Sequence, residues 1–318
     1  MTGADAHALE GPTRDAAKVL LITLVLNLLV AGAKVVYGNM TGTLTIRADG
    51  FHSLTDGTNN VLGLLGIWWA SRPPDEQHPY GHEKIEVLAA GAIGASLLLV
   101  AWNLVRDGVS RLAHPEAPQL DAGAWVVLGL TFLVNIGVWR YEARQAERLH
   151  SPFLASDAAH TLSDLAVTAG VALAVGCLQL GWTWVDPIAT LLIAGFIVVT
   201  GVRVVRGNLG YLLDAAQLDE ALVQRIVCQV PGVASAHKIR TRGTPGRVRV
   251  DLHIQIAPHL DVRRAHEVTH WAIDAIKRQI DGVRDVVVHT EPAREGAPYP
   301  ALPQSQVASE RSEPNPGP

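Results

Sequence analysis

The stretch ADGFHSLTDG, residues 48–57, lies inside an apolar segment that is long enough to cross a membrane. A similar stretch, SDAAHTLSDL, occupies residues 156–165 of another such segment. The two share two acids and a histidine at identical spacing, which are Asp49, His52 and Asp56 in the first and Asp157, His160 and Asp164 in the second. An acid at the middle of a bilayer costs roughly 2.5–3.5 kcal/mol or more, so these groups are expected to have a function.

The composition indicates a chain with two different parts. Hydrophobic residues make up 48% of the 318 residues, charged residues make up 18%, and the mean hydropathy is +0.20. The apolar runs lie in the first two-thirds, whereas the last third resembles an ordinary soluble domain. The net charge of −4 and the lack of a long basic run give no indication of nucleic-acid binding. The two cysteines, Cys177 and Cys228, are too few for a disulfide framework.

Six segments are apolar and long enough to cross a bilayer, which takes about 20 residues. They lie at about 16–38, 44–70, 86–110, 122–142, 153–180 and 184–207. The amino terminus lacks the basic-then-apolar order of a cleavable signal peptide, so the first segment is expected to remain as a span. The sequence therefore predicts a bundle of six transmembrane helices over 16–208, after an amino-terminal segment at 1–15.

The distribution of basic residues predicts the orientation of this bundle. Most of its Lys and Arg residues lie before the first span, after the second and fourth spans, and at the end of the sixth. The short loops after the first and fifth spans contain none. Because basic loops favour the cytoplasm, both termini are expected on the cytoplasmic side. The protein is accordingly predicted to be an integral protein of the cell (inner) membrane.

The residues after about 209 predict a small α+β domain. LDEALVQRIVCQV has the apolar spacing of a helix, two alternating segments around GTPG predict strands, and an amphipathic helix and a last strand follow. This order, αββαβ over 209–292, is typical of a ferredoxin-like domain with helices on one face of a sheet. The tail at 293–318 is rich in Pro, Ser and Glu and is expected to be disordered.

The repeated stretches predict a metal site inside the membrane. The histidine and the second acid of each stretch are four residues apart, so they share one face of a helix. The second and fifth spans run antiparallel, and such inverted repeats place substrate near the membrane midplane. Two nitrogens and two oxygens suit tetrahedral Zn²⁺. The earlier acids, Asp49 and Asp157, either orient these ligands through hydrogen bonds or help to solvate the end of the helix.

Three motifs carry a resemblance to a known family: HSLTD (52–56), HTLSD (160–164) and HPYGHEKIE (78–86). In these motifs and their order, the chain resembles the cation diffusion facilitators, which export zinc and similar divalent metals. The resemblance covers about residues 14–292. It implies a homodimer, one mid-membrane transport site in each protomer, and exchange of metal for protons. The transport ligands that it implies are His52, Asp56, His160 and Asp164.

The loop PPDEQHPYGHEK, residues 73–84, predicts a second metal site near the membrane surface. Its three candidate ligands are Asp75, His78 and His82. The resemblance implies a peripheral metal at these positions, and the alternative is a solvated loop with a turn. The resemblance also implies a salt bridge between Lys84 and an acid just beyond the last span, for which Asp214 is the candidate.

The carboxy-terminal domain predicts a third metal site. Its candidate ligands are His237, His253, His266, His289 and Glu291. His289 and Glu291 are two residues apart on one strand, so they share a face and can bind together. The resemblance implies that metal binds at closely matching positions near a dimer interface. Surface histidines without a ligand role are the alternative.

The function that these observations predict is secondary transport: export of a divalent cation, with Zn²⁺ favoured, in exchange for protons. Its partners are metal ions, protons, the lipid bilayer and a second copy of the chain. Zn²⁺ fits two histidines and two aspartates best, and Fe²⁺, Co²⁺ and Cd²⁺ are further candidates because they accept mixed nitrogen and oxygen ligands. Mn²⁺ is less favoured because relatives specialised for it have acids where His160 stands.

Two other classes of protein are weighed against a transporter. A membrane metalloenzyme of the di-metal hydroxylase type is suggested by the HxxxH spacing in HPYGH, but the chain lacks the further HxxHH motif, and it lacks HExxH and GxSxG. A metal sensor without flux is the other alternative, and the intact inverted repeat argues against it. The sequence therefore predicts a transporter and no enzyme.

Overall fold

The computed structural model describes residues 3–41, 44–113, 122–179, 182 and 185–302. Within helices it leaves out some side chains, among them those of residues 44–52 and of Asp56. The chain divides into two compact units, Met1–Leu213 and Asp214–Pro318.

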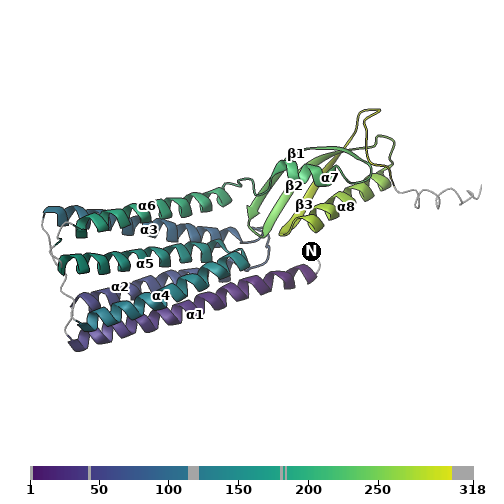
Figure 1. Ribbon diagram of the computed structural model, residues 1–318. Coiled ribbons are helices and arrows are strands. Elements are labelled where there is room, and N and C mark those ends of the chain that lie inside the picture. Colours follow the sequence, from purple (N-terminus) through teal and green to yellow (C-terminus); the bar gives the residue numbers. More distant parts are fainter. Residues whose placement is uncertain (1–2, 42–43, 114–121, 180–181, 183–184, 303–318) are drawn as a thin grey trace, which may run out of the picture. The chain divides into compact units, whose positions relative to one another are not determined.

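The first unit consists of long helices that Figure 1 shows side by side. They are α1 (Gly3–Thr41), α2 (Leu44–Ala70), α3 (Lys84–Ala113), α4 (Ala122–Leu149), α5 (Pro152–Gln179) and α6 (Val185–Leu212). Within the described ranges, four apolar stretches are long enough to cross a membrane: Asp15–Tyr37, Lys84–Ser110, Trp125–Leu149 and Pro187–Leu212. These stretches belong to α1, α3, α4 and α6, and the two remaining helices carry the repeated His and Asp residues.

Large apolar side chains cover the outer surface of this unit. Leu29 of α1 is 66% exposed and Leu192 of α6 is 71% exposed, and Val126 and Leu99 are exposed to a similar extent. A water-soluble protein rarely exposes contiguous apolar surface of this kind, whereas hydrocarbon solvates it well. The surface therefore suits a bundle that lies in lipid.

Small residues allow the helices to pack closely. A Cβ at Gly94 of α3 would lie 2.8 Å from Val204 of α6, so only glycine fits this contact. A Cβ at Gly63 of α2 would lie 2.2 Å from the ring of Phe153 on α5, which is fully buried. Close approach through small residues is common between membrane helices. The Gly63–Phe153 contact brings α2 and α5, the two halves of the repeat, together.

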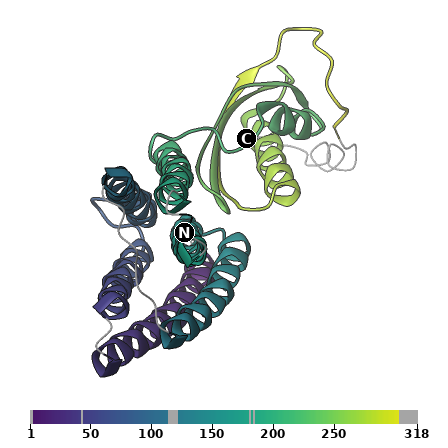
Figure 2. The same ribbon diagram turned by 60° about the vertical axis from the view of Figure 1, so that its left-hand side comes forward.

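The second unit is a three-stranded sheet with two helices. Its elements are α7 (Glu220–Val227), β1 (Val233–Thr244), β2 (Arg247–Ile256), α8 (Val262–Gln279) and β3 (Val283–Pro292). The strand order is β1-β2-β3, with β1 and β2 antiparallel and β2 and β3 parallel. Both helices lie on the same side of the sheet (Figure 2).

The sequence of the second unit explains this arrangement. Asp219 and Asp261 cap the two helices by accepting backbone N–H groups with their carboxylates. In β2, alternate residues from Val248 to Ile256 are buried, and they pack with apolar residues of α7 and α8 in one core. The other face of the sheet carries the polar half of the strand pattern, including His253.

The fold agrees with the predicted class, a six-helix membrane bundle followed by an αββαβ domain, and two boundaries differ in detail. The bundle was expected to end at 208, and α6 continues to Leu212. The tail was expected to be disordered from 293, yet its described part contacts the second unit. The N–H of Gly232 donates to the carbonyl of Pro300 at 2.9 Å, and Leu302 packs against the core. The remainder of that expectation, 303–318, lies outside the described residues.

Candidate functional site

The helix that carries the second repeat begins at a well-defined cap. The hydroxyl of Ser151 accepts the N–H of Leu154 at 3.2 Å and donates to Glu86 Oε1 of α3 at 2.5 Å. Pro152 is the first residue of α5, a position where its missing N–H costs no helical hydrogen bond. These contacts fix the depth at which His160 and Asp164 follow, about two and three turns further along.

His160 and Asp164 lie on one face of α5. The distance from His160 Nε2 to Asp164 Oδ2 is 3.7 Å, which is too long for a hydrogen bond. It is close to the spacing of two ligands on one tetrahedral ion, about 3.3 Å for bonds of ~2.0 Å. His160 is only 5% exposed, whereas the Asp164 side chain is 33% exposed. The spacing of this pair would therefore allow both groups to bind one cation, with the carboxylate the more accessible of the two.

The backbone brings the first repeat to the same depth. Gly63 of α2 packs against Phe153 of α5, and the two helices run in opposite directions because three connections separate them. Asp56 precedes Gly63 by seven residues on α2, and His160 follows Phe153 by seven residues on α5. In the same way, His52 precedes Gly63 by eleven residues and Asp164 follows Phe153 by eleven. The four predicted transport ligands therefore lie within about one turn of each other along the bundle.

A small cavity opens beside the His160–Asp164 pair. Its volume is about 40 Å³, enough for about three water molecules at 10–15 Å³ each. Its lining comes from α1, α2, α4 and α5, and consists of Asn27, Val30, Ser53, Asn60, Asn135, Asp157, His160, Thr161 and Asp164. Eight of these nine residues are polar, so the cavity is suited to a hydrated cation.

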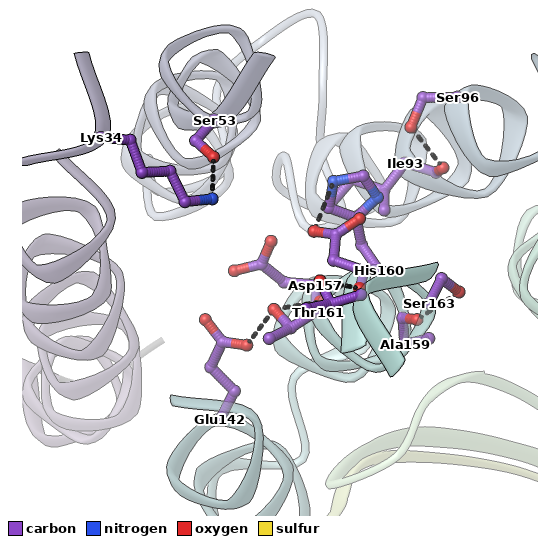
Figure 3. Close-up of polar contacts among 12 residues, drawn as sticks. Lys34, Ser53, Ile93, Ser96, Glu142, Asp157, Ala159, His160, Thr161 and Ser163 are labelled. Carbon is purple, nitrogen blue, oxygen red and sulfur yellow. Dashed lines mark hydrogen bonds and ion pairs between the residues drawn. The ribbon is translucent and has the colours of Figure 1, made fainter. Parts of the chain in front are cut away.

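The side chains of His52, Asp56 and Asp49 lie outside the described residues, although their backbone belongs to α2. Their neighbour Ser53 is described: Lys34 Nζ of α1 donates to Ser53 Oγ at 3.0 Å (Figure 3). Lys34 is 6% exposed. A buried ammonium group therefore lies beside the first repeat, a feature that the sequence analysis did not identify.

A second group that the sequence analysis missed is Glu142 on α4. It is fully buried, and its Oε2 accepts a hydrogen bond from Thr161 Oγ1 at 2.8 Å (Figure 3). Asp157 of α5 is 2% exposed, and Figure 3 shows its carboxylate facing that of Glu142. Glu142 was overlooked because it is the last residue of the predicted fourth span, and an acid at that position is ordinarily interpreted as part of the polar end of a helix.

The loop residues Asp75, His78 and His82 come together. Asp75 Oδ1 lies 3.1 Å from His78 Nδ1, and Asp75 Oδ2 lies 3.4 Å from His82 Nε2. Asp75 Oδ1 also accepts the backbone N–H groups of Gln77 and His78, at 3.0 and 2.6 Å. The hydrogen bond from the His78 N–H lowers the pKa of the Asp75 carboxyl below its usual range. The cluster can therefore offer a carboxylate and two imidazoles to one metal ion.

Strand register aligns three histidines on the sheet of the second unit. His237 of β1 pairs with His253 of β2, which pairs with His289 of β3. Adjacent strands are about 4.8 Å apart, so the rings lie in a row. Glu291 is next to this row: its carboxylate lies 2.8 Å from His253 Nδ1, 3.3 Å from His237 Nε2 and 3.9 Å from His289 Nε2. The hydrogen bond from His253 lowers the pKa of Glu291.

The fifth predicted ligand of this unit has a different neighbour. His266 lies on α8, and its ring centroid is 4.4 Å from that of His270. The group whose ligand atoms lie within 4.8 Å of one another consists of His237, His253 and Glu291. The structure thus brings His289 close to this group but places His266 beside His270 instead.

Lys84 begins α3 and contacts the end of α6. Its Nζ donates to the carbonyl oxygen of Leu212 at 3.3 Å. A cation at the last turn of a helix stabilises the orphan carbonyls and the negative end of the helix dipole. The predicted salt bridge with Asp214 stays a prediction.

Comparison with known proteins matches both units to one family. Residues 20–213 match the cation efflux transmembrane domain, and residues 216–293 match the cytoplasmic domain of cation efflux proteins. These matches confirm the predicted family and fold class, and they place the second unit in the cytoplasm. The protein is a transporter and no enzyme.

Three relatives illustrate the similarity. An uncharacterised transporter of Methanocaldococcus jannaschii is 28% identical over 86% of this chain and 96% of its own length. The manganese efflux system protein MneP of Bacillus subtilis is 27% identical over 86% of this chain and 95% of its own. The cation-efflux pump FieF of Klebsiella pneumoniae is 30% identical over 80% of this chain and 85% of its own.

The matched regions include the cavity between α1, α2, α4 and α5, the loop cluster and the histidine row of the sheet. The chain therefore belongs to the cation efflux family and exports divalent cations across a membrane.

Proposed function

We propose that this chain exports Zn²⁺ from the cytoplasm in exchange for protons, and that one ion at a time is held by His52, Asp56, His160 and Asp164. The observation that carries the proposal is the His160–Asp164 pair beside a polar cavity in the membrane unit. The antiparallel α2 helix supplies a matching His–Asp pair at the same depth. Two nitrogen and two oxygen ligands suit Zn²⁺ in tetrahedral geometry.

Exchange for protons follows from the chemistry of the ligands. Zn²⁺ binds neutral histidine and ionised aspartate, so protons and the ion compete for the same four side chains. Imidazole groups in general protonate near pH 6.5, close to the pH of both compartments. Protons that bind to these side chains from the outer side therefore displace the ion to the outside. The protons then move to the cytoplasm when the emptied site opens to that side.

The ion crosses when the helices around a fixed site rearrange. Inverted repeats are typical of transporters that rock one half against the other. We propose that the chain works as a homodimer, in keeping with the family of the cytoplasmic unit. The loop cluster of Asp75, His78 and His82 and the cluster of His237, His253 and Glu291 bind further Zn²⁺ ions, which stabilise the assembly or regulate it.

Manganese is the second candidate substrate. One relative is named as a manganese efflux protein, and eight polar residues around the cavity include three asparagines whose amide oxygens suit a harder ion. The two histidines favour Zn²⁺ because nitrogen ligands discriminate against Mn²⁺. The choice between the ions therefore depends on which groups contact the dehydrated ion.

The test is uptake of Zn²⁺, Mn²⁺, Fe²⁺, Co²⁺ and Cd²⁺ into proteoliposomes with an imposed pH gradient. We expect Zn²⁺ to be carried fastest and its flux to follow the direction and size of the gradient. If Mn²⁺ were taken up faster than Zn²⁺, Mn²⁺ would be the substrate in place of Zn²⁺. A flux that does not respond to the pH gradient would overturn the proposal of proton exchange.

A further inference from the structure

Two buried carboxylates lie in the membrane unit beside the four proposed transport ligands. Glu142 of α4 and Asp157 of α5 are 0% and 2% exposed. Within the part of the chain that the structure describes, Glu142 Oε1 and Asp157 Oδ2 have no hydrogen-bond partner. Two adjacent carboxylates in a low-dielectric interior repel each other, and each is expensive to bury. A proton shared between them or a cation bound between them removes both penalties.

The side-chain amide of Asn60, which lines the same cavity as Asp157, can present its oxygen to such a cation. The hydroxyl hydrogen of Thr23 points to the carbonyl of Leu20 at 3.2 Å, so Thr23 Oγ1 acts as acceptor for Asn60 Nδ2 at 3.3 Å. This arrangement turns the amide nitrogen of Asn60 away from the cavity that the residue lines and leaves its oxygen for the cavity. Asp157 and Asn60 thus offer oxygen ligands from α5 and α2 around the same space.

The depth of these groups indicates when an ion would meet them. α6 ends at Leu212, next to the cytoplasmic unit, so the end of α4 and the start of α5 lie on the cytoplasmic side. Asp157 precedes Asp164 by seven residues of helix, or about 10 Å. An ion moving from the cytoplasm therefore reaches Glu142 and Asp157 before His160 and Asp164.

We propose that Glu142 and Asp157, completed by the amide oxygen of Asn60 and by water, form a second divalent-cation site on the cytoplasmic side of the transport site. Its ligands are all oxygen, so it accepts hydrated Mn²⁺ or Mg²⁺ as well as Zn²⁺ and does not select among them. Selection follows one step later, at the histidine-containing site. The inference rests on the proposed transport function, but its test measures binding and does not need flux.

The binding test uses the full-length protein in nanodiscs and Mn²⁺, which is detected by electron paramagnetic resonance. Asp164→Asn removes a transport ligand and serves as the background. In that background we expect Glu142→Gln to bind one Mn²⁺ fewer per protomer, and Asp157→Asn to do the same. Glu147→Gln, an exposed acid on the same helix, is the matched control and should bind as much as the background. Equal Mn²⁺ binding with and without Glu142 would overturn the proposal.

A second measurement separates a cation site from a packing role. Thr161→Val removes the hydrogen bond to Glu142 but keeps both carboxylates. In proteoliposomes, Glu142→Gln should slow flux about tenfold at low ion concentration, the size of effect seen when groups next to metal ligands are replaced. Thr161→Val should have a smaller effect. If the two variants lose flux equally while Mn²⁺ binding is intact, Glu142 only supports the packing of α4 on α5.

Discussion

The membrane unit and the cytoplasmic unit both combine histidines with a carboxylate, but they do so in different surroundings. His160 is 5% exposed on a helix, beside a cavity in the bundle. The side chains of His237, His253 and Glu291 are 24–37% exposed on the open face of a sheet. Ionisable groups are expensive in a bilayer and inexpensive on a wet surface. The same ligand chemistry therefore fits the proposed transport site in the first case and the proposed stabilising or regulatory ion in the second.

The largest effect is expected from removing a carboxylate of the membrane site. Asp164→Ala or Asp56→Ala should abolish Zn²⁺ flux while folding and dimerisation persist, because each variant loses one of the two carboxylates of the proposed transport site. Flux of the purified variants in proteoliposomes measures this. Asp107→Ala, an exposed acid on α3, is the control and should transport normally. Near-normal flux in either ligand variant would remove that residue from the transport site.

A change of ligand type should alter selectivity rather than abolish flux. His160→Asp or His52→Asp makes the membrane site richer in oxygen and more negative, so Mn²⁺ and Cd²⁺ should gain relative to Zn²⁺. The pH profile should also move, because carboxyl groups ordinarily titrate near pH 4 and imidazoles near 6.5. Flux of each ion between about pH 5.5 and 8 tests both points. An unchanged ion ranking with an unchanged profile would mean that these histidines are not ligands.

Loss of a ligand in the cytoplasmic unit should have a partial effect. His253→Ala removes the central imidazole of the row, so Zn²⁺ occupancy of the full-length protein should fall and its dimer should weaken. Flux should drop only partly, since the ion does not pass through this cluster. Metal analysis and sedimentation measure these changes against His259→Ala, an exposed histidine of the same unit. A complete loss of flux in His253→Ala would contradict the proposal that this cluster holds a stabilising or regulatory ion rather than the transported one.

The smallest effect concerns the pH dependence of the cytoplasmic cluster. The hydrogen bond from His253 lowers the pKa of Glu291, so this carboxylate stays ionised below the pH at which a free glutamate is protonated. Its contribution to stability is therefore present above the ordinary glutamate pKa and is lost only as pH falls through the lowered value. Protons compete with Zn²⁺ for the imidazoles of the cluster, so Zn²⁺ binding should decline before Glu291 itself is protonated. Calorimetric titrations that show binding intact at pH 5.5 and lost near pH 4 would contradict this order.

The sequence predicted the elements and singled out the repeated His and Asp residues because both leave a periodic signal. Apolar runs of about 20 residues mark helices in lipid, and HxxxD places two groups on one helix face. In β1, β2 and β3 the histidines were recognised, but their alignment in a row depends on strand register. Register follows from a bulge between His237 and Arg240 and from the parallel pairing of β3, neither of which has a local sequence signature.

Single polar residues were harder to predict than repeated ones. Asn27, Asn60 and Asn135 line the cavity. In the sequence, each is an isolated amide in an apolar helix, and a role in helix packing would be an equally good interpretation. Lys34 and Glu142 are isolated in the same way. Their importance depends on which helices meet, and helix pairing is set by contacts such as Gly63 against Phe153. The packing of Leu302 against the core was not predicted either, because composition alone does not reveal such a contact.

X-ray absorption at the zinc edge tests the membrane site most directly. The sample is the full-length protein with Asp75→Ala and His253→Ala, which disable the loop and cytoplasmic clusters, loaded with one equivalent of Zn²⁺. We predict four nitrogen or oxygen ligands at about 2.0–2.1 Å with the scattering of two imidazoles, and loss of this pattern in Asp164→Ala. A six-coordinate shell of oxygen without imidazole, unchanged by Asp164→Ala, would contradict the central claim.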